Sequence, residues 1–142
     1  MGSLNAFLKE NAVQEENIKY PASNRFLNEQ GSPIEWELCA ITSEEDEMIR
    51  KDCTRKVPVP GKKGVFQPEV DFPKYLGKLA ARCVVFPNLN DAALQDNYKV
   101  MGNDVLLKVM LKPGEYADLL TKVQEINAFD ITMEDLVEEG KN

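Results

Sequence analysis

Histidine does not occur in the 142-residue chain, which removes much of the chemistry that a sequence can suggest. Without an imidazole, most zinc sites and every histidine-based catalytic arrangement are excluded. Three cysteines, Cys39, Cys53 and Cys83, are far apart and form no short Cys pair. Each lies in or near an apolar segment, where a cysteine usually behaves as a small hydrophobe. Because only Lys51 and Arg82 could activate one of these thiols, we expect buried thiols in a reducing cytoplasm.

The other groups that could act as acids, bases or nucleophiles are carboxylates, lysines and tyrosines. None stands in a recognisable catalytic constellation, and the sequence has no glycine-rich phosphate loop or nucleophile motif. Paired carboxylates such as Glu44 and Glu45 occur on nearly any acidic helix. We therefore expect no enzymatic activity, no metal site and no cofactor.

The C-terminal segment is the most suggestive candidate for a partner-binding site. Thr132 and Asp135 form a predicted capping box, and Gly140 is placed to end the helix. Its apolar stripe could lie in a partner's groove or dock on the protein's own helices, and own docking is favoured because Phe129 and Ile131 also need burial. The partner-binding residues predicted in this segment are Phe129, Ile131, Met133, Leu136, Val137 and Glu138.

A second candidate lies in residues 57–73, where repeated prolines and glycines forbid a continuous helix and disfavour a central strand. The pattern predicts a loop or a ragged ribbon, longer than a routine connection. Lys62 and Lys63, with two further basic residues just upstream, make it a basic region. Phe66 is its one aromatic residue before position 72, too few for base stacking. We interpret Lys62, Lys63 and Phe66 as a protein-docking site, with solubility alone as the alternative.

Helices in the second half must position these residues. Three apolar runs with helical period lie between residues 75 and 126, separated by Pro87 and Pro113, and a short run capped by residues 88–91 lies between the first two. Such faces should pack together as a bundle. Gly77 interrupts the first run, which close packing would explain. The apolar residues are Tyr75, Leu76, Leu79, Ala80, Cys83 and Val84, then Val105, Leu106, Val109 and Met110, then Tyr116, Leu119, Leu120, Val123 and Ile126.

The first half shows a different period. Residues 34–40 alternate apolar with polar side chains, as in a half-buried strand, and residues 25–27 could pair with them across a turn at 28–32. The sequence therefore predicts an antiparallel hairpin.

Two helices flank this hairpin. A short helix over residues 3–11 is expected to dock its apolar side onto the body, because so short a helix is marginal alone. Thr42 and Glu45 predict a capping box that starts a second helix, with basic residues toward its end. We expect one α+β domain over residues 1–142, mostly helical, with a small antiparallel hairpin or sheet in residues 1–70 and a helical bundle in residues 71–142.

Composition limits the partners. A net charge of −7 and a pI near 4.7 argue against a general nucleic-acid binder, which needs excess Lys and Arg. No apolar run approaches the roughly 20 residues that cross a bilayer, and no basic segment followed by an apolar one appears, so we expect no secretion. We expect a cytoplasmic protein without membrane contact, and a homo-oligomer is possible.

Short motifs along nearly the whole chain carry a family resemblance. They are Leu4, 6–11, 34–37, 41–46, 74–80, 85–91, 94–96, 100–102, 106–108 and 113–116. With these motifs the chain resembles the XkdN-like phage tail assembly chaperone family of PBSX-type prophages. The resemblance implies a chaperone that binds tail proteins in the bacterial host cytoplasm, with the tape measure protein as the first candidate partner and tube subunits as the second, and without catalysis. The alternative is a structural subunit retained in the finished tail.

Overall fold

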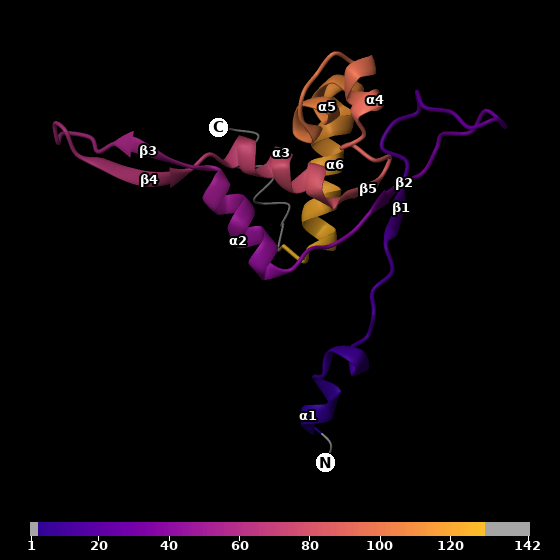
Figure 1. The fold of residues 1–142 in the computed structure, drawn as a ribbon, viewed down its shortest axis with the longest axis horizontal. Helices are drawn as coiled ribbons and strands as arrows, with labels where there is room; N and C mark the ends of the chain where they lie inside the picture. Colours follow the sequence, from indigo (N-terminus) through magenta and orange to yellow (C-terminus); the bar gives the residue numbers. More distant parts are fainter. Residues whose placement is uncertain (1–2, 130–142) are drawn as a thin grey trace.

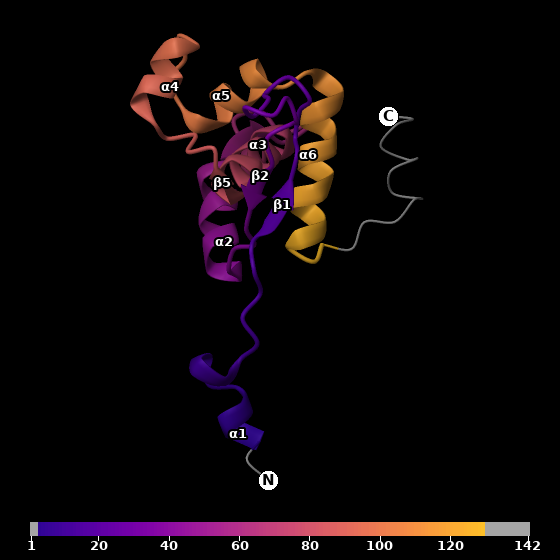
Figure 2. The same ribbon diagram turned by 90° about the vertical axis from the view of Figure 1, so that its right-hand side faces the viewer.

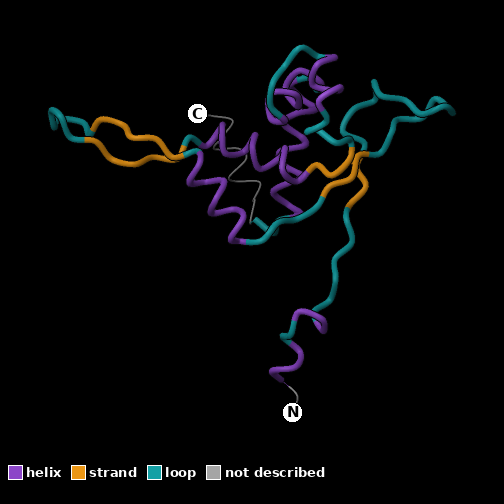
Figure 3. The backbone as a smooth tube through the Cα atoms, viewed as in Figure 1, coloured by secondary structure: helices purple, strands orange, loops and turns teal. Residues whose placement is uncertain are grey.

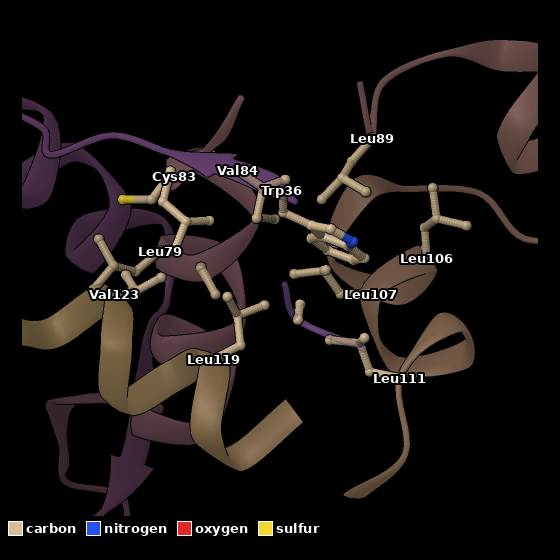
Figure 4. Packing of buried hydrophobic residues seen from close by; sticks show 14 of the residues in the cluster. Trp36, Leu79, Cys83, Val84, Leu89, Leu106, Leu107, Leu111, Leu119 and Val123 are labelled. Atoms are coloured by element: carbon tan, nitrogen blue, oxygen red, sulfur yellow. The ribbon is translucent and has the colours of Figure 1, made fainter. Parts of the chain in front are cut away.

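Three helices form the centre of the structure, a computed structural model that describes residues 3–129 (Figure 1). These helices are α3 (Phe72–Cys83), α5 (Asn103–Met110) and α6 (Pro113–Ile126). α3 contacts both α5 and α6, because each helix buries the apolar face that its sequence period predicts. Leu79, Leu107 and Leu119 are almost wholly buried, and Figure 4 shows side chains from these helices converging. The predicted helical bundle in the second half is confirmed.

Local capping sets where the helices begin. The Asp71 carboxylate accepts a hydrogen bond of 3.2 Å from the backbone N–H of Lys74 in the first turn of α3. The Asp91 carboxylate does the same at 2.9 Å for Leu94 in the short helix α4 (Ala92–Asn97). Each side chain satisfies an N–H group that has no partner within the helix. These starts are therefore dictated by residues that lie three positions apart.

Gly77 allows α3 to approach α6. A Cβ atom built on Gly77 would lie 2.8 Å from the hydroxyl oxygen of Tyr116. That oxygen is buried and has no hydrogen-bond partner among the described residues. The close packing expected at Gly77 is thus observed, and the neighbouring Tyr116 hydroxyl forms no hydrogen bond with the described residues.

A three-stranded antiparallel sheet lies against the bundle. Its strands, in spatial order, are β1 (Ile18–Tyr20), β2 (Trp36–Leu38) and β5 (Val84–Phe86). β2 is central, and its alternation buries Trp36 and Leu38 to 1% and 0% exposure. The apolar alternation predicted for this segment is confirmed.

The predicted pairing of residues 25–27 with residues 34–40 is observed only beside the turn. There Leu27 and Pro33 form an isolated antiparallel bridge, and the Ile34 N–H donates a 2.8 Å hydrogen bond to the Phe26 carbonyl. The strand partners of β2 are instead β1 and β5, at positions 18–20 and 84–86. The turn at 28–32 itself is confirmed, since the Asn28 side chain accepts hydrogen bonds of 2.9 Å from two backbone N–H groups within it.

Helix α2 (Ser43–Asp52) packs on α3 and leads into a second, separate sheet. The Thr42 hydroxyl accepts a 3.2 Å hydrogen bond from the Glu45 N–H, which confirms half of the predicted capping box. The Glu45 carboxylate instead contacts Arg82 at 2.7 Å. Strands β3 (Thr54–Pro58) and β4 (Phe66–Val70) then form an antiparallel hairpin. The proline-rich segment is therefore a regular ribbon, and Figure 3 shows it well apart from the other strands.

The N-terminal arm does not dock as expected. It consists of α1 (Ser3–Ala6) and a 3-10 turn, η1 (Lys9–Asn11), and none of its residues is buried. Figure 2 shows the arm extending away from the bundle, and Phe7 is 83% exposed. The sequence correctly predicts an apolar side, but this side contacts no other part of the described chain.

Candidate partner-binding surfaces

The hairpin, defined here as residues 54–70, holds three of the predicted binding residues. Lys62 and Lys63 occupy the tip, between Gly61 and Gly64, which both have φ of +77°. Such a backbone favours glycine and closes the tight turn. Phe66 begins the returning strand and is 59% exposed. The three residues thus lie at or next to the turn of this hairpin, which projects from the body as a two-stranded ribbon (Figure 1).

Phe129 lies at a different place, where α6 ends. Its backbone N–H donates a 3.0 Å hydrogen bond to the carbonyl of Gln124. Its side chain lines a cavity of about 110 Å³ together with Thr42 and Ser43 at the start of α2. Phe129 is therefore separated by the length of α2 from the hairpin. The other predicted residues of this segment, Ile131, Met133, Leu136, Val137 and Glu138, lie outside the described residues.

A third surface was not predicted from the sequence. An apolar cavity of about 210 Å³ opens beside the sheet, and Phe86 at its edge is 50% exposed. The two sides of the 28–32 turn, strands β2 and β5, and helices α4 and α5 each contribute to it, so no single sequence window could reveal it. The Arg25 guanidinium holds the turn in place by donating to the Met110 carbonyl. The lining residues are Phe26, Ile34, Trp36, Phe86, Pro87, Leu94, Tyr98 and Met110.

The polar cluster that most resembles an active site joins α2 to α3. The Arg50 guanidinium donates to Asp46 at 2.9 Å and to the Tyr75 hydroxyl at 3.2 Å, and the Tyr75 hydroxyl donates to Asp46. Burial, followed by this bond to Asp46, raises the pKa of Tyr75 to about 12. A phenol that holds its proton so firmly is a poor acid or base at neutral pH. The cluster is thus a structural tie between two helices.

The cysteines largely match expectation. Cys53 and Cys83 are buried, and Cys39 is half-buried beside the Arg82 guanidinium at 3.7 Å. Burial raises the pKa of the Cys83 thiol to about 11, so that thiol stays protonated at neutral pH. Across residues 3–129, no group of three His, Cys, Asp or Glu side chains is placed to hold a metal ion. No helix in that part of the chain is long and apolar enough to cross a membrane.

Known proteins share both this sequence and this fold. The family model described as "Phage XkdN-like tail assembly chaperone protein" matches residues 4–141. The chain is 32% identical over 140 residues to the phage-like element PBSX protein XkdN of Bacillus subtilis (strain 168), covering 98% of this chain and 93% of that protein. The uncharacterized protein YqbN of the same strain is also 32% identical, with the same coverage. The crystal structure of YqbN superposes with a TM-score of 0.75 at 26% identity, covering 88% of this chain and 95% of that one.

Proposed function

The chain belongs to the phage XkdN-like tail assembly chaperone family. We propose that it binds the tape measure protein during tail assembly in the bacterial host cytoplasm, with tube subunits as a second candidate partner. It acts by binding alone and has no catalytic step. A tape measure chain has apolar stretches that must stay soluble until the tube encloses them. Binding shifts such a chain away from aggregation by mass action.

One observation carries this proposal: the molecule exposes large aromatic side chains on two surfaces, the hairpin and the rim of the apolar cavity. Phe66 on the hairpin and Phe86 beside the apolar cavity are both at least half exposed. Exposed aromatic residues with a polar rim are typical of sites that bind other proteins. We assign partner contact to Lys62, Lys63 and Phe66, and to the C-terminal residues from Phe129 to Glu138 named above.

The alternative role is a structural subunit of the finished tail. Subunit pairing through a sheet needs a long free edge, whereas β1 and β5, the outer strands of the three-stranded sheet, have only three residues each. The chaperone role is therefore favoured. Mass spectrometry of purified particles separates the two roles, because a retained subunit appears in stoichiometric amount and a chaperone does not.

Co-expression tests the proposal. The tape measure protein would be produced alone, with this protein, and with an unrelated acidic protein of similar size as the control. We expect the soluble tape measure protein to increase only with this protein, and the two to co-purify through size exclusion. If this protein and the unrelated one give equal solubility, and neither co-purifies, the proposed function is wrong.

A further inference from the structure

The hairpin differs in charge from the rest of the molecule. Residues 54–70 carry Arg55, Lys56, Lys62 and Lys63 against the single acid Glu69, a net charge of +3 in a chain whose total is −7. The Arg55 guanidinium forms an ion pair with the Asp71 carboxylate, with 3.8 Å between nitrogen and oxygen. None of the three lysines forms an ion pair with a described residue. A projecting basic ribbon on an acidic protein attracts acidic partners to that one place, because the remaining surface is negatively charged and repels them.

The hairpin's backbone edges are protected against strand addition. The Val59 N–H donates to the Val65 carbonyl and the Asp71 N–H donates to the Cys53 carbonyl, both at 2.9 Å. Since bonded and non-bonded pairs alternate in an antiparallel ladder, the pairs 56–68 and 58–66 direct their backbone groups outward. Pro58 and Pro68 occupy such positions and have no N–H to offer. A third strand would therefore lose a hydrogen bond on either edge.

With the edges blocked, the faces of the ribbon remain available. Paired residues point to the same side, so Lys56, Pro58, Phe66 and Pro68 share one side, which we name the Phe66 face. Three of these are apolar, and all four are exposed. Val70 lies on the same side at the base of the ribbon, where it packs against the core. Beyond that base, the opposite side carries Val57 and Val59, which are partly buried, so the Phe66 face is the more open one. It presents an aromatic residue, two prolines and a lysine.

The charge and the aromatic residue of the hairpin define the chemistry of its occupant. A segment that fits them carries carboxylates beside an apolar side, because the lysines attract the carboxylates and Phe66 can contact the apolar side.

We propose that the Phe66 face, together with Lys62 and Lys63, binds an acidic segment of a tail protein that carries an apolar side, and binds it through side chains without adding a strand. This inference rests on the proposed function and specifies its partner chemistry. Phe66 supplies the apolar anchor, and the lysines at positions 56, 62 and 63 pair with carboxylates around it. Attraction between exposed charges also makes the interaction weaken as ionic strength rises.

Overlapping 20-residue peptides from the tape measure and tube proteins provide the probe. Their binding to the full chain would be measured by fluorescence anisotropy, alongside the triple variant K56E/K62E/K63E and the variant F66S. We expect the bound peptides to be acidic, and both variants to bind them roughly tenfold more weakly. The control is K9E/K99E/K108E, which changes the net charge equally at exposed lysines outside the hairpin. It should bind as the wild type does.

Three outcomes would overturn this inference while leaving the proposed function intact. These are tail proteins that co-purify equally well with the hairpin variants, bound peptides that are neutral or basic, and a hairpin that binds DNA or a second copy of this chain in place of the peptides. Absence of any co-purifying tail protein counts against the proposed function itself. Circular dichroism melting of each variant confirms that the fold is intact, as expected for changes at exposed positions.

Discussion

Two sheets in this molecule use their side chains in opposite ways. In the three-stranded sheet, Trp36 and Leu38 of β2 are buried under the helices. This burial stabilises a strand of only three residues. In the hairpin, β3 and β4 have five residues each, yet only Val57 and Val70 are even partly buried. Isolated two-stranded ribbons are marginal in water. The first sheet therefore contributes to the core, whereas the hairpin contributes little to it, which is what the proposed role of the hairpin in partner binding requires.

The largest effect expected from this comparison comes from truncating one aromatic residue in each sheet. Trp36→Ala leaves a cavity in the core and should lower the free energy of unfolding by about 3–5 kcal/mol. Phe66→Ala removes an exposed side chain and should change it by less than about 0.5 kcal/mol. Urea denaturation followed by circular dichroism measures both. Comparable losses for the two variants would show that the hairpin is part of the folding core.

A second prediction tests how tightly the core is packed at Gly77. Gly77→Ala places a Cβ atom 2.8 Å from the Tyr116 hydroxyl, so we expect a loss of about 1–3 kcal/mol despite the better helix propensity of alanine. Tyr116→Phe removes that oxygen. Because the hydroxyl is buried without a described partner, this change alone should be neutral or slightly stabilising.

The double variant Gly77→Ala/Tyr116→Phe decides between the two explanations of that glycine. If the hydroxyl is the obstacle, the double variant should recover most of the lost stability, which appears as a coupling energy in the mutant cycle. Additive effects would instead place the obstacle in the backbone of α3.

The helices could be predicted from the sequence because their signals are local. Asp71 and Thr42 cap residues three positions away, and the apolar faces repeat within one window. The partners of β2 could not be predicted, because β1 precedes β2 in the sequence and β5 follows it only after two helices and the hairpin. β5 also follows α3 directly, and Val84 continues the helical apolar pattern into it. Three residues are too few to show a new period.

Of the candidate surfaces, one could likewise be predicted from the sequence and another could not. Composition alone identified Lys62, Lys63 and Phe66, because a basic run in an acidic chain is visible in the sequence. The prolines there predicted a loop or a ragged ribbon, and the ribbon is regular because the positions of Pro58 and Pro68, which lack an N–H group, face outward. The apolar cavity could not be predicted, since its lining comes together only in the fold.

A third, smaller effect concerns the tie between α2, which carries the hairpin, and the core. The pKa of Tyr75 is raised to about 12 in the folded state, above its ordinary value of 10, so its contribution to stability is complete below pH 10 and is lost as the pH rises toward 12. Tyr75→Phe should cost about 1 kcal/mol at pH 7, because one net hydrogen bond is lost. It should also flatten the decline in stability between pH 10 and 12. Urea denaturation at several pH values measures this, and an unchanged alkaline slope would contradict the assignment to Tyr75.

The smallest effect on stability is expected at the edge of the hairpin, where Pro68→Thr should change the free energy of unfolding by less than about 0.5 kcal/mol. Threonine restores an outward N–H between those of Phe66 and Val70, so β4 would offer an uninterrupted edge for pairing. We therefore expect stronger concentration-dependent association than in the wild type, measured by sedimentation velocity. Gln67→Thr is the matched control, because residue 67 lies in an inward-bonded pair with Val57. Equal association in both variants would show that Pro68 does not protect this edge, and the side-chain mode of binding proposed for the Phe66 face would lose its main support.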